Sequence, residues 1–142
     1  MINKFGYYLE KGHVKKRTPD PTEAKSLLNK AIERLDYFKS DKIEDKKASI
    51  ILENVYEAIR ESTQSLMSLK GFKPYSQEAT ISFIREFYPK EFTEDEINKF
   101  DMFRLLRNDS VYRAVPIFKR DAESCLKFAK EFVDKIKKLE KY

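Results

Sequence analysis

Apolar residues recur at intervals of three and four along almost the whole chain, which is the spacing of one face of an α-helix. No stretch shows the sustained alternation of apolar and polar residues that marks a half-buried strand. We therefore predict an all-α fold, an antiparallel up-and-down bundle of about five main helices after a short leader helix near Asn3 to Lys11. The predicted core positions are Ala24, Leu28, Ala31, Leu35 and Phe38; Ala48, Ile51, Val55, Ile59, Ser62, Leu66 and Leu69; Ala79, Phe83, Ile84 and Phe87; Ile97, Phe100, Phe103 and Leu106; and Ala122, Leu126, Ala129, Val133 and Ile136.

Capping and helix-breaking residues set the boundaries of these helices. Gly71 suits a left-handed cap at the end of the longest helix, and Pro74 follows where a helix has already stopped. Thr93 and Glu96 form a capping-box pattern at the start of the helix before last. The charged segment 40–47 is predicted to be a turn between helices. The main helices are expected from after Pro21 to near Ser40, over about 45–69, from Ser76 to before Pro89, from Thr93 to Val111 or Tyr112, and over about 120–139.

The length and composition favour a single domain that spans residues 1–142. A chain of 142 residues is close to the commonest domain size. Hydrophobic residues make up 41% of the chain, charged residues 37%, and the mean hydropathy is −0.67. No run of about 18 apolar residues is present, so we exclude a membrane-spanning protein. The amino-terminal residues lack the apolar centre of a signal peptide, and we expect a cytoplasmic protein.

Several kinds of site chemistry are excluded by residue counts. The single cysteine, Cys125, rules out an internal disulfide and a Cys-rich zinc site, and we expect it to pack as a small apolar residue. The single histidine, His13, rules out metal motifs built on a pair of histidines. The three glycines form no phosphate-binding loop of a familiar kind. We therefore expect no metal and no cofactor.

The charge of the chain leaves two readings open. A formal net charge of +5 and a pI near 9.1 are a weak indication of nucleic-acid binding, but also fit the surface of a soluble helical protein. The basic run 15–17, with Lys11, either binds phosphate or is a solvated loop beside prolines, and we favour the loop. Glu53, Glu57 and Glu61 have a spacing suited to a divalent ion, but such a row without a partner helix is expected to face solvent.

The most unusual local sequence is the stretch 104–113, which reads RLLRNDSVYR and precedes a loop broken by a proline. At 100° per residue Arg104 and Asn108 share a helix face, Arg107 lies toward the next face, and Tyr112 is one turn beyond Asn108. Polar groups thus gather at one helix end. The alternative reading is that the charged residues are ordinary surface charges and that Tyr112 is at the edge of the core with a solvated hydroxyl.

This stretch, in its helical context, resembles the motif of the HEPN family. The motif is an Arg, then a polar residue that is typically Asn, Asp or His, and a His four to six residues after the Arg. Arg107 matches the Arg, Asn108 matches the polar residue, and Tyr112 occupies the His position with four residues intervening. The resemblance extends over nearly the whole length, through a long central helix, a short helix, the motif helix, a loop at 112–116 and a closing helix.

The resemblance implies a helical bundle that forms a homodimer with the two motif helices facing each other. It also implies two activities found in the family. Several members are metal-independent RNases, often toxins, and others are partners of a small nucleotidyltransferase. Residues expected to bind RNA or nucleotide are Arg104, Arg107, Asn108, Tyr112 and Arg113, and the catalytic set of an RNase would be Arg107, Asn108 and Tyr112.

The chain departs from the motif at the position that matters most for catalysis. Cleavage through a 2′-hydroxyl needs a group that accepts a proton near neutral pH, and the ordinary pKa of a tyrosine, about 10, makes it a poor base. His13 would replace the missing base only if the amino-terminal segment folded over the motif. We therefore expect a non-catalytic or weakly catalytic dimer that binds RNA or nucleotide, or an accessory subunit of a nucleotidyltransferase. A metal-independent endoribonuclease and a purely structural interaction module are the alternatives.

Overall fold

The computed structural model describes residues 1–39 and 42–140, which form six helices and two short strands. The all-α prediction is confirmed, with five long or medium helices after a short leader. The elements are α1 (Phe5–Glu10), β1 (Val14–Lys16), α2 (Pro21–Phe38), α3 (Asp45–Lys70), β2 (Phe72–Pro74), α4 (Gln77–Phe87), α5 (Glu94–Arg113) and α6 (Lys119–Leu139). None of the helices in these ranges is both long enough and apolar enough to cross a membrane.

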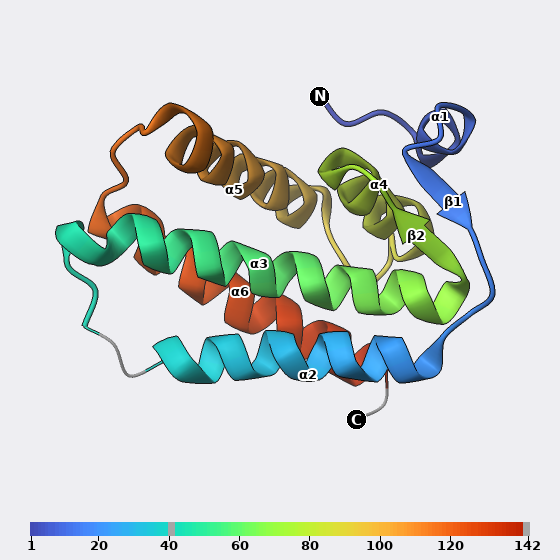
Figure 1. Cartoon of the computed structure of the whole chain (residues 1–142), viewed down its shortest axis with the longest axis horizontal. Helices are drawn as coiled ribbons and strands as arrows, with labels where there is room; N and C mark the ends of the chain where they lie inside the picture. The colour runs from blue at the N-terminus through green and yellow to red at the C-terminus, as the bar shows by residue number, and fades with distance from the viewer. Residues whose placement is uncertain (40–41, 141–142) are drawn as a thin grey trace.

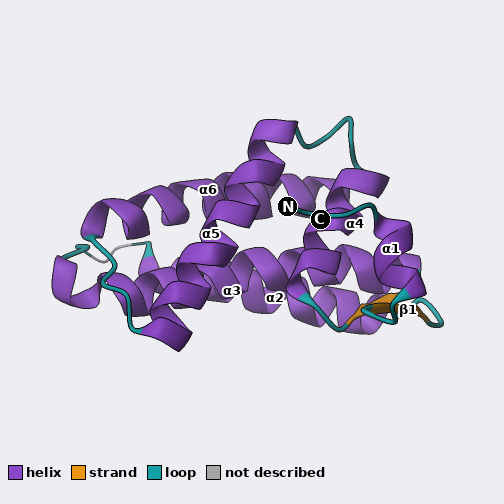
Figure 2. Cartoon of the chain, turned by 90° about the horizontal axis from the view of Figure 1, so that it is seen from above, coloured by secondary structure: helices purple, strands orange, loops and turns teal. Residues whose placement is uncertain are grey.

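The helix α3 lies at the centre of the molecule and contacts α2, α4, α5 and α6 (Figure 1). Helices α2 and α3 run antiparallel, whereas α3 and α6 run in the same direction along the long axis. Seen from above, α5 crosses over the bundle and ends at the side away from the β-strands (Figure 2). The carboxyl end of α5, which carries the motif, is therefore supported by α3 beneath it and remains open to solvent on its other side.

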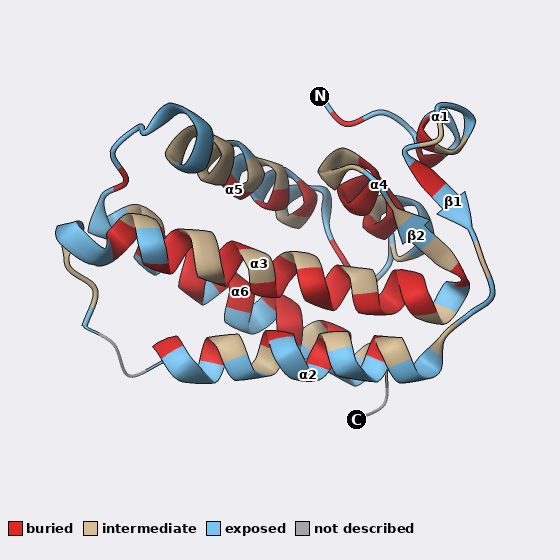
Figure 3. Ribbon diagram, viewed as in Figure 1, coloured by how far each residue is buried: buried red, intermediate tan, exposed pale blue. Residues whose placement is uncertain are grey.

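The predicted apolar positions form one continuous core. All five of those predicted for α2 and all five of those predicted for α6 are buried, and the buried stripe of α3 faces both helices (Figure 3). Phe87 is the main exception among the predicted residues, because it lies at the edge of the core against the rings of Phe5 and Phe83. Helical spacing thus identified the core faces correctly, because burial of one stripe is what stabilises each helix.

Local capping signals also end and begin the helices where they were expected. Gly71 has φ +83°, the left-handed conformation that ends α3. The Thr93 hydroxyl accepts a hydrogen bond from Glu96 N at 3.1 Å, and Glu96 Oε1 accepts one from Thr93 N at 3.0 Å, so the capping box is present. The predicted charged turn over 40–47 is too long, because α3 begins at Asp45; residues 40–41 lie outside the described residues.

The sequence pattern did not predict the two strands. They pair antiparallel, with Val14 opposite Pro74, Lys15 opposite Lys73 and Lys16 opposite Phe72. Each strand has only three residues, which is too short for alternation to be recognised. The basic run 15–17 was expected in a loop. Its first two residues instead belong to β1, which is hydrogen-bonded to β2, the strand that follows α3.

Candidate functional site

The motif occupies the last three turns of α5, whose direction is fixed at both ends. The capping box begins the helix, and the buried side chains of Ile97, Phe100 and Phe103 hold its first half against the core. At the other end Ala114 adopts φ +51°, and Val115 N donates to Asp109 O at 3.1 Å. The helix therefore ends at Arg113, three residues before Pro116 and just beyond the predicted end at Val111 or Tyr112.

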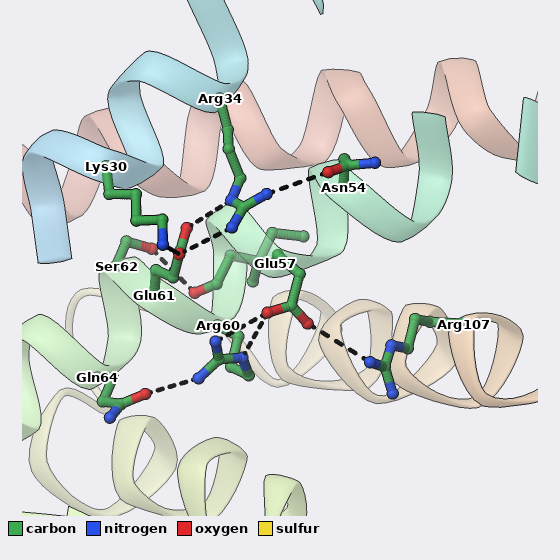
Figure 4. A network of polar contacts seen from close by, with 10 residues as sticks. Lys30, Arg34, Asn54, Glu57, Arg60, Glu61, Ser62, Gln64 and Arg107 are labelled. Carbon is green, nitrogen blue, oxygen red and sulfur yellow. Dashed lines mark hydrogen bonds and ion pairs between the residues drawn. The ribbon is translucent and has the colours of Figure 1, made fainter. Parts of the chain in front are cut away.

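Arg107 points inward, toward the middle of α3 (Figure 4). Only 18% of its side chain is exposed, and its Nη2 lies 3.7 Å from Glu57 Oε1. Nη1 donates to the Asn108 side-chain oxygen at the long distance of 3.4 Å. Its Nε is buried and has no hydrogen-bond partner among the described residues. Arg107 is thus placed by one distant ion pair and retains an unused donor.

Glu57 is bound more closely by another arginine. Arg60 donates to Glu57 Oε2 from Nε at 3.0 Å and from Nη2 at 2.8 Å, and its Nη1 donates to Gln64 Oε1 at 2.6 Å. The two hydrogen bonds from Arg60 are much shorter than the 3.7 Å contact with Arg107. Glu57 would therefore keep an arginine partner if Arg107 moved away. Of the two arginines beside Glu57, Arg107 is the more weakly bound.

Tyr112 lies at the surface beside Arg107. Tyr112 is 72% exposed, so the alternative interpretation from the sequence, which placed it at the edge of the core, is wrong. The Arg107 Cζ atom is 5.7 Å from the centre of the Tyr112 ring, within the range of a cation–π contact. The structure therefore brings together Arg107, Asn108 and Tyr112.

The other two predicted binding residues point elsewhere. Arg104 is directed toward α4, with 11% of its side chain exposed, and it donates to Asp101 at 2.7 Å while lying 3.8 Å from Glu78. Arg113 is exposed and lies 3.3 Å from Asp109 on its own helix. Each of these arginines thus has a carboxylate partner in the same chain, and the motif does not present a cluster of uncompensated positive charge.

A buried tyrosine that the sequence did not single out lies among these arginines. Tyr56 of α3 is fully buried, and its hydroxyl donates to Gln77 Oε1 at 2.7 Å. Burial raises the pKa of Tyr56 far above its ordinary value, although the positive charges of Arg104, Arg107 and Arg60 oppose the shift. Tyr56 therefore stays protonated and acts as a neutral donor beneath the motif. In the sequence, only its position three residues before the predicted core residue Ile59 indicates its burial.

The acidic row of α3 was expected to face solvent, and this expectation is wrong for all three of its members. Glu61 is buried and pairs with Arg34 of α2, and Glu57 faces the motif helix. Glu53 is half-buried and accepts a hydrogen bond from the Ser110 hydroxyl at 2.7 Å. Within the described ranges no three His, Cys, Asp or Glu side chains lie close enough to hold a metal ion. The row joins helices instead.

Two other candidates lie away from the motif. His13 is exposed and follows α1, at the end of the long axis opposite the carboxyl end of α5 (Figure 1), so it cannot replace the missing base within one chain. Cys125 is fully buried, and burial raises the pKa of its thiol well above the usual range. Its predicted role as a small apolar residue is confirmed.

Comparison with known proteins gives one result that covers most of the chain. A search of curated proteins found no match. The family model described as the HEPN domain matches residues 24–139, which run from the first turn of α2 to the end of α6 and include the whole motif. The remaining residues contribute α1 and β1, outside the matched range. With nearly its whole length matched and a helical bundle as its fold, the chain belongs to the HEPN domain family.

Proposed function

We propose that this HEPN-domain protein binds RNA or a nucleotide at the carboxyl end of α5, with little or no catalytic activity. The observation that carries the proposal is the weak binding of Arg107 within its own chain. Its Nε has no partner among the described residues, its ion pair with Glu57 is 3.7 Å long, and an exposed tyrosine ring lies beside it.

A phosphate group would satisfy this arrangement. A buried donor without a partner costs about 1–3 kcal/mol. When Arg107 turns outward from Glu57, a phosphate oxygen would accept a charge-assisted hydrogen bond from it. Glu57 would keep its two bonds from Arg60, so its charge would stay compensated. The Tyr112 ring is exposed and offers a surface on which a base stacks.

The same geometry argues against efficient cleavage. The residue in the position of the family's histidine has a hydroxyl group, which is a poor proton acceptor at neutral pH. No histidine in the chain is near enough to take over this role, since His13 lies at the opposite end of the molecule. A metal-independent endoribonuclease remains the alternative, and measurement of cleavage distinguishes it.

We also propose that two copies associate through the outer face of α5. Met102 and Leu105 are exposed and lie on one side of this helix, opposite the buried Phe100 and Phe103. An apolar stripe on the outer side of a helix that already buries its inner side is typical of an interface. The dimer implied by family membership would cover this stripe and place two motifs near each other. Arg104, Arg107 and Arg113 each lie near a carboxylate of their own chain, so two facing motifs would not bring together uncompensated positive charges.

Two further functions are an accessory role beside a partner protein and a purely structural role. An accessory role beside a small nucleotidyltransferase would use the same exposed stripe or the motif. A purely structural role is favoured by one contact, the Arg107 and Glu57 pair, which joins α5 to α3. In that case Arg107 would stabilise the fold without touching a ligand.

The test compares two arginines that each lie beside an aromatic ring. Arg107→Ala removes the motif donor, and Arg120→Ala removes an arginine whose Cζ is 5.9 Å from the Phe118 ring, outside the motif. Binding of a labelled single-stranded RNA is measured by fluorescence anisotropy at fixed salt. We expect Arg107→Ala to weaken binding by roughly 1–3 kcal/mol and Arg120→Ala to leave it nearly unchanged. Unchanged binding in folded Arg107→Ala would favour the structural role.

A further inference from the structure

The two-stranded sheet lies at the end of the molecule opposite the motif (Figure 1), and its exposed residues are basic and aromatic. Because side chains alternate along a strand, Lys15 of β1 and Lys73 of β2 lie on the same side, away from the buried Val14. Tyr75 follows β2 and continues this exposed face, and His13 lies across from it, joined by a hydrogen bond from Tyr75 N to His13 O at 2.7 Å. We call these four exposed residues, His13, Lys15, Lys73 and Tyr75, the strand face.

The two lysines of the strand face form an unfavourable pair. Lys15 and Lys73 are directly opposite each other in the sheet, and like charges in this position destabilise it. Neither forms an ion pair with a carboxylate of the described residues. No carboxylate in that part of the chain compensates this repulsion, whereas an anion between the two ammonium groups would do so.

The ring of Tyr75 lies within cation–π distance of both charges. Tyr75 is 57% exposed, and the Nζ atoms of Lys15 and Lys73 are 5.3 Å and 5.8 Å from its ring centre. The same end of the molecule carries other pairs of this kind, with Lys11 Nζ 5.8 Å from the Tyr7 ring and Lys70 Nζ 5.5 Å from the Phe87 ring. Alternating ammonium groups and aromatic rings are the chemistry that binds single-stranded nucleic acid, through phosphate contacts and base stacking.

The strand face is held in place by the fold. Val14 is buried in the core, and the Phe72 ring packs at 5.2 Å against the ring of Phe5. Arg17 N donates to Gly71 O at 2.9 Å, and the Arg17 side chain donates to the Ser68 hydroxyl at 2.8 Å and pairs with Glu23. The exposed residues therefore stand on a rigid support, so a ligand would bind without paying for the ordering of the backbone.

We propose that the strand face binds one nucleotide unit of single-stranded RNA, with a base stacked on Tyr75 and a phosphate between Lys15 and Lys73. A base that stacks on the ring displaces an ammonium group from it, and the displaced ammonium then meets the phosphate. The ligand class rests on the proposed function, but the strand face is separate from Arg107. An RNA strand bound at both places would run along the bundle.

The experiment measures binding of a labelled single-stranded RNA of about ten nucleotides, by fluorescence anisotropy over a range of salt concentrations. Tyr75→Leu removes the ring, and Tyr75→Phe keeps it. Lys15→Gln with Lys73→Gln removes the paired charges. Its matched control is Lys90→Gln with Lys137→Gln, two exposed lysines on the turn after α4 and on α6. Circular dichroism melting checks that each variant is folded.

We expect Tyr75→Leu to weaken binding about tenfold and Tyr75→Phe to change it less than about twofold. The Lys15 and Lys73 variant should bind more weakly and have a log–log salt slope smaller by about 1.4, the loss of two phosphate contacts at about 0.7 each. Its melting temperature should not fall, because the substitution removes a like-charge pair. The salt slope of the Lys90 and Lys137 control should differ from that of the natural chain by less than half of this change.

Other outcomes would overturn the proposal. Wild-type affinity in both Tyr75→Leu and the Lys15 and Lys73 variant would show that the strand face does not touch RNA. Competition by polyglutamate as strong as that by unlabelled RNA, with no effect of Tyr75→Leu, would assign the face to acidic peptides. Full competition by AMP through Tyr75 would assign it to a free nucleotide instead of a strand.

The Arg107→Ala variant separates this proposal from the proposed function. Loss of binding in Arg107→Ala, with none in the variants of the strand face, would reject the strand face and keep the motif. The reverse result would reject the motif as the RNA site and keep the strand face. Absence of any RNA binding by the natural chain would reject both.

Discussion

The guanidinium of Arg34 forms two hydrogen bonds with the buried carboxylate of Glu61, from Nε to Oε1 at 2.8 Å and from Nη2 to Oε2 at 3.2 Å (Figure 4). Only 3% of the Glu61 side chain is exposed, and Arg34 Nη1 donates a third bond to the Asn54 side chain at 3.0 Å. The hydrogen bond with Glu61 raises the pKa of Arg34, while burial opposes the shift. This contact joins α2 to α3 beside the cluster that holds Arg107.

We predict that Arg34→Met destabilises the protein by about 3 kcal/mol, because it leaves the Glu61 carboxylate buried without its main partner. Arg60→Met is the matched control, since its partner Glu57 is more exposed, and a loss below about 1 kcal/mol is expected there. Urea denaturation followed by circular dichroism measures both. Adding Glu61→Leu to Arg34→Met should restore most of the loss, and failure to do so would show that Arg34 acts through packing instead of charge.

The stability of the α5 start should depend on pH through Glu96. Burial raises the pKa of this carboxyl, but the hydrogen bonds from Thr93 N and from Lys135 outweigh it, so the net shift is downward from 4.5. The ionised Glu96 carboxylate therefore stabilises the fold fully at pH values above its ordinary pKa. This stabilisation is lost as the pH falls through the lower pKa of the folded state. We expect Glu96→Gln to cost about 1–2 kcal/mol at pH 7 and progressively less below pH 4.5.

The control for this prediction is Glu94→Gln, which removes the same charge from the same exposed first turn. It should cost only a few tenths of a kcal/mol, from the helix dipole. Urea denaturation at several pH values measures both variants. A loss in Glu96→Gln that stays constant down to acid pH would contradict the assignment of this stabilisation to the ionised carboxylate.

Cys125 should be unreactive in the folded protein. Burial raises the pKa of its thiol and shields it from reagents, and only the thiolate attacks a disulfide. We expect almost no reaction with Ellman's reagent at pH 8, and one equivalent of released thiolate per chain once the protein is unfolded in urea. Fast reaction of the folded chain would mean that α6 opens locally.

Replacing Tyr112 separates binding from catalysis. Tyr112→His supplies the base that the family motif contains, so cleavage of RNA in the presence of a chelator should rise above that of the natural protein. Tyr112→Phe keeps the ring and removes one hydroxyl, so binding should weaken by about 1 kcal/mol or less. Gel electrophoresis of a labelled RNA measures cleavage. Efficient cleavage by the natural protein that Tyr112→Phe abolishes would instead support an endoribonuclease.

Association of two copies should depend on the outer face of α5. Leu105→Asp places a charge in the exposed apolar stripe, and Ile50→Asp places one at an exposed apolar residue of α3. Sedimentation velocity at micromolar concentration should show a dimer for the natural chain and for Ile50→Asp, and a monomer for Leu105→Asp, because burying an unpaired charge is unfavourable. A natural chain that sediments as a monomer would exclude this interface.

Much of the fold could be predicted because its signals are local. A helix buries a stripe that repeats every three or four residues, and a cap needs residues only three apart, such as Thr93 and Glu96. The place of the motif at the end of α5 could be predicted for the same reason, since Pro116 ends the helix wherever the rest of the chain lies. The paired strands could not be predicted, because three residues are too few to show a period. Their partners are also distant in the sequence: Lys15 and Lys73, the middle pair, are 58 residues apart.

The contact partner of Arg107 could not be predicted from the sequence. The apolar spacing did predict the buried side of the first half of α5, where Phe100 and Phe103 lie. It carried no information about Glu57 of α3, which Arg107 meets only because α5 crosses that helix, while Tyr112 remains at the surface.

By itself, the sequence determined the helices, their core faces, the burial of Cys125 and the position of Arg107, Asn108 and Tyr112 near one helix end. Only the tertiary structure decided which charges meet. Arg107 reaches Glu57, and Arg34 reaches Glu61, because the packing of α2 and α5 against α3 sets how far each helix is rotated and shifted along its neighbour. Spacing within one helix fixes which side chains share a face, but carries no information about the face opposite it.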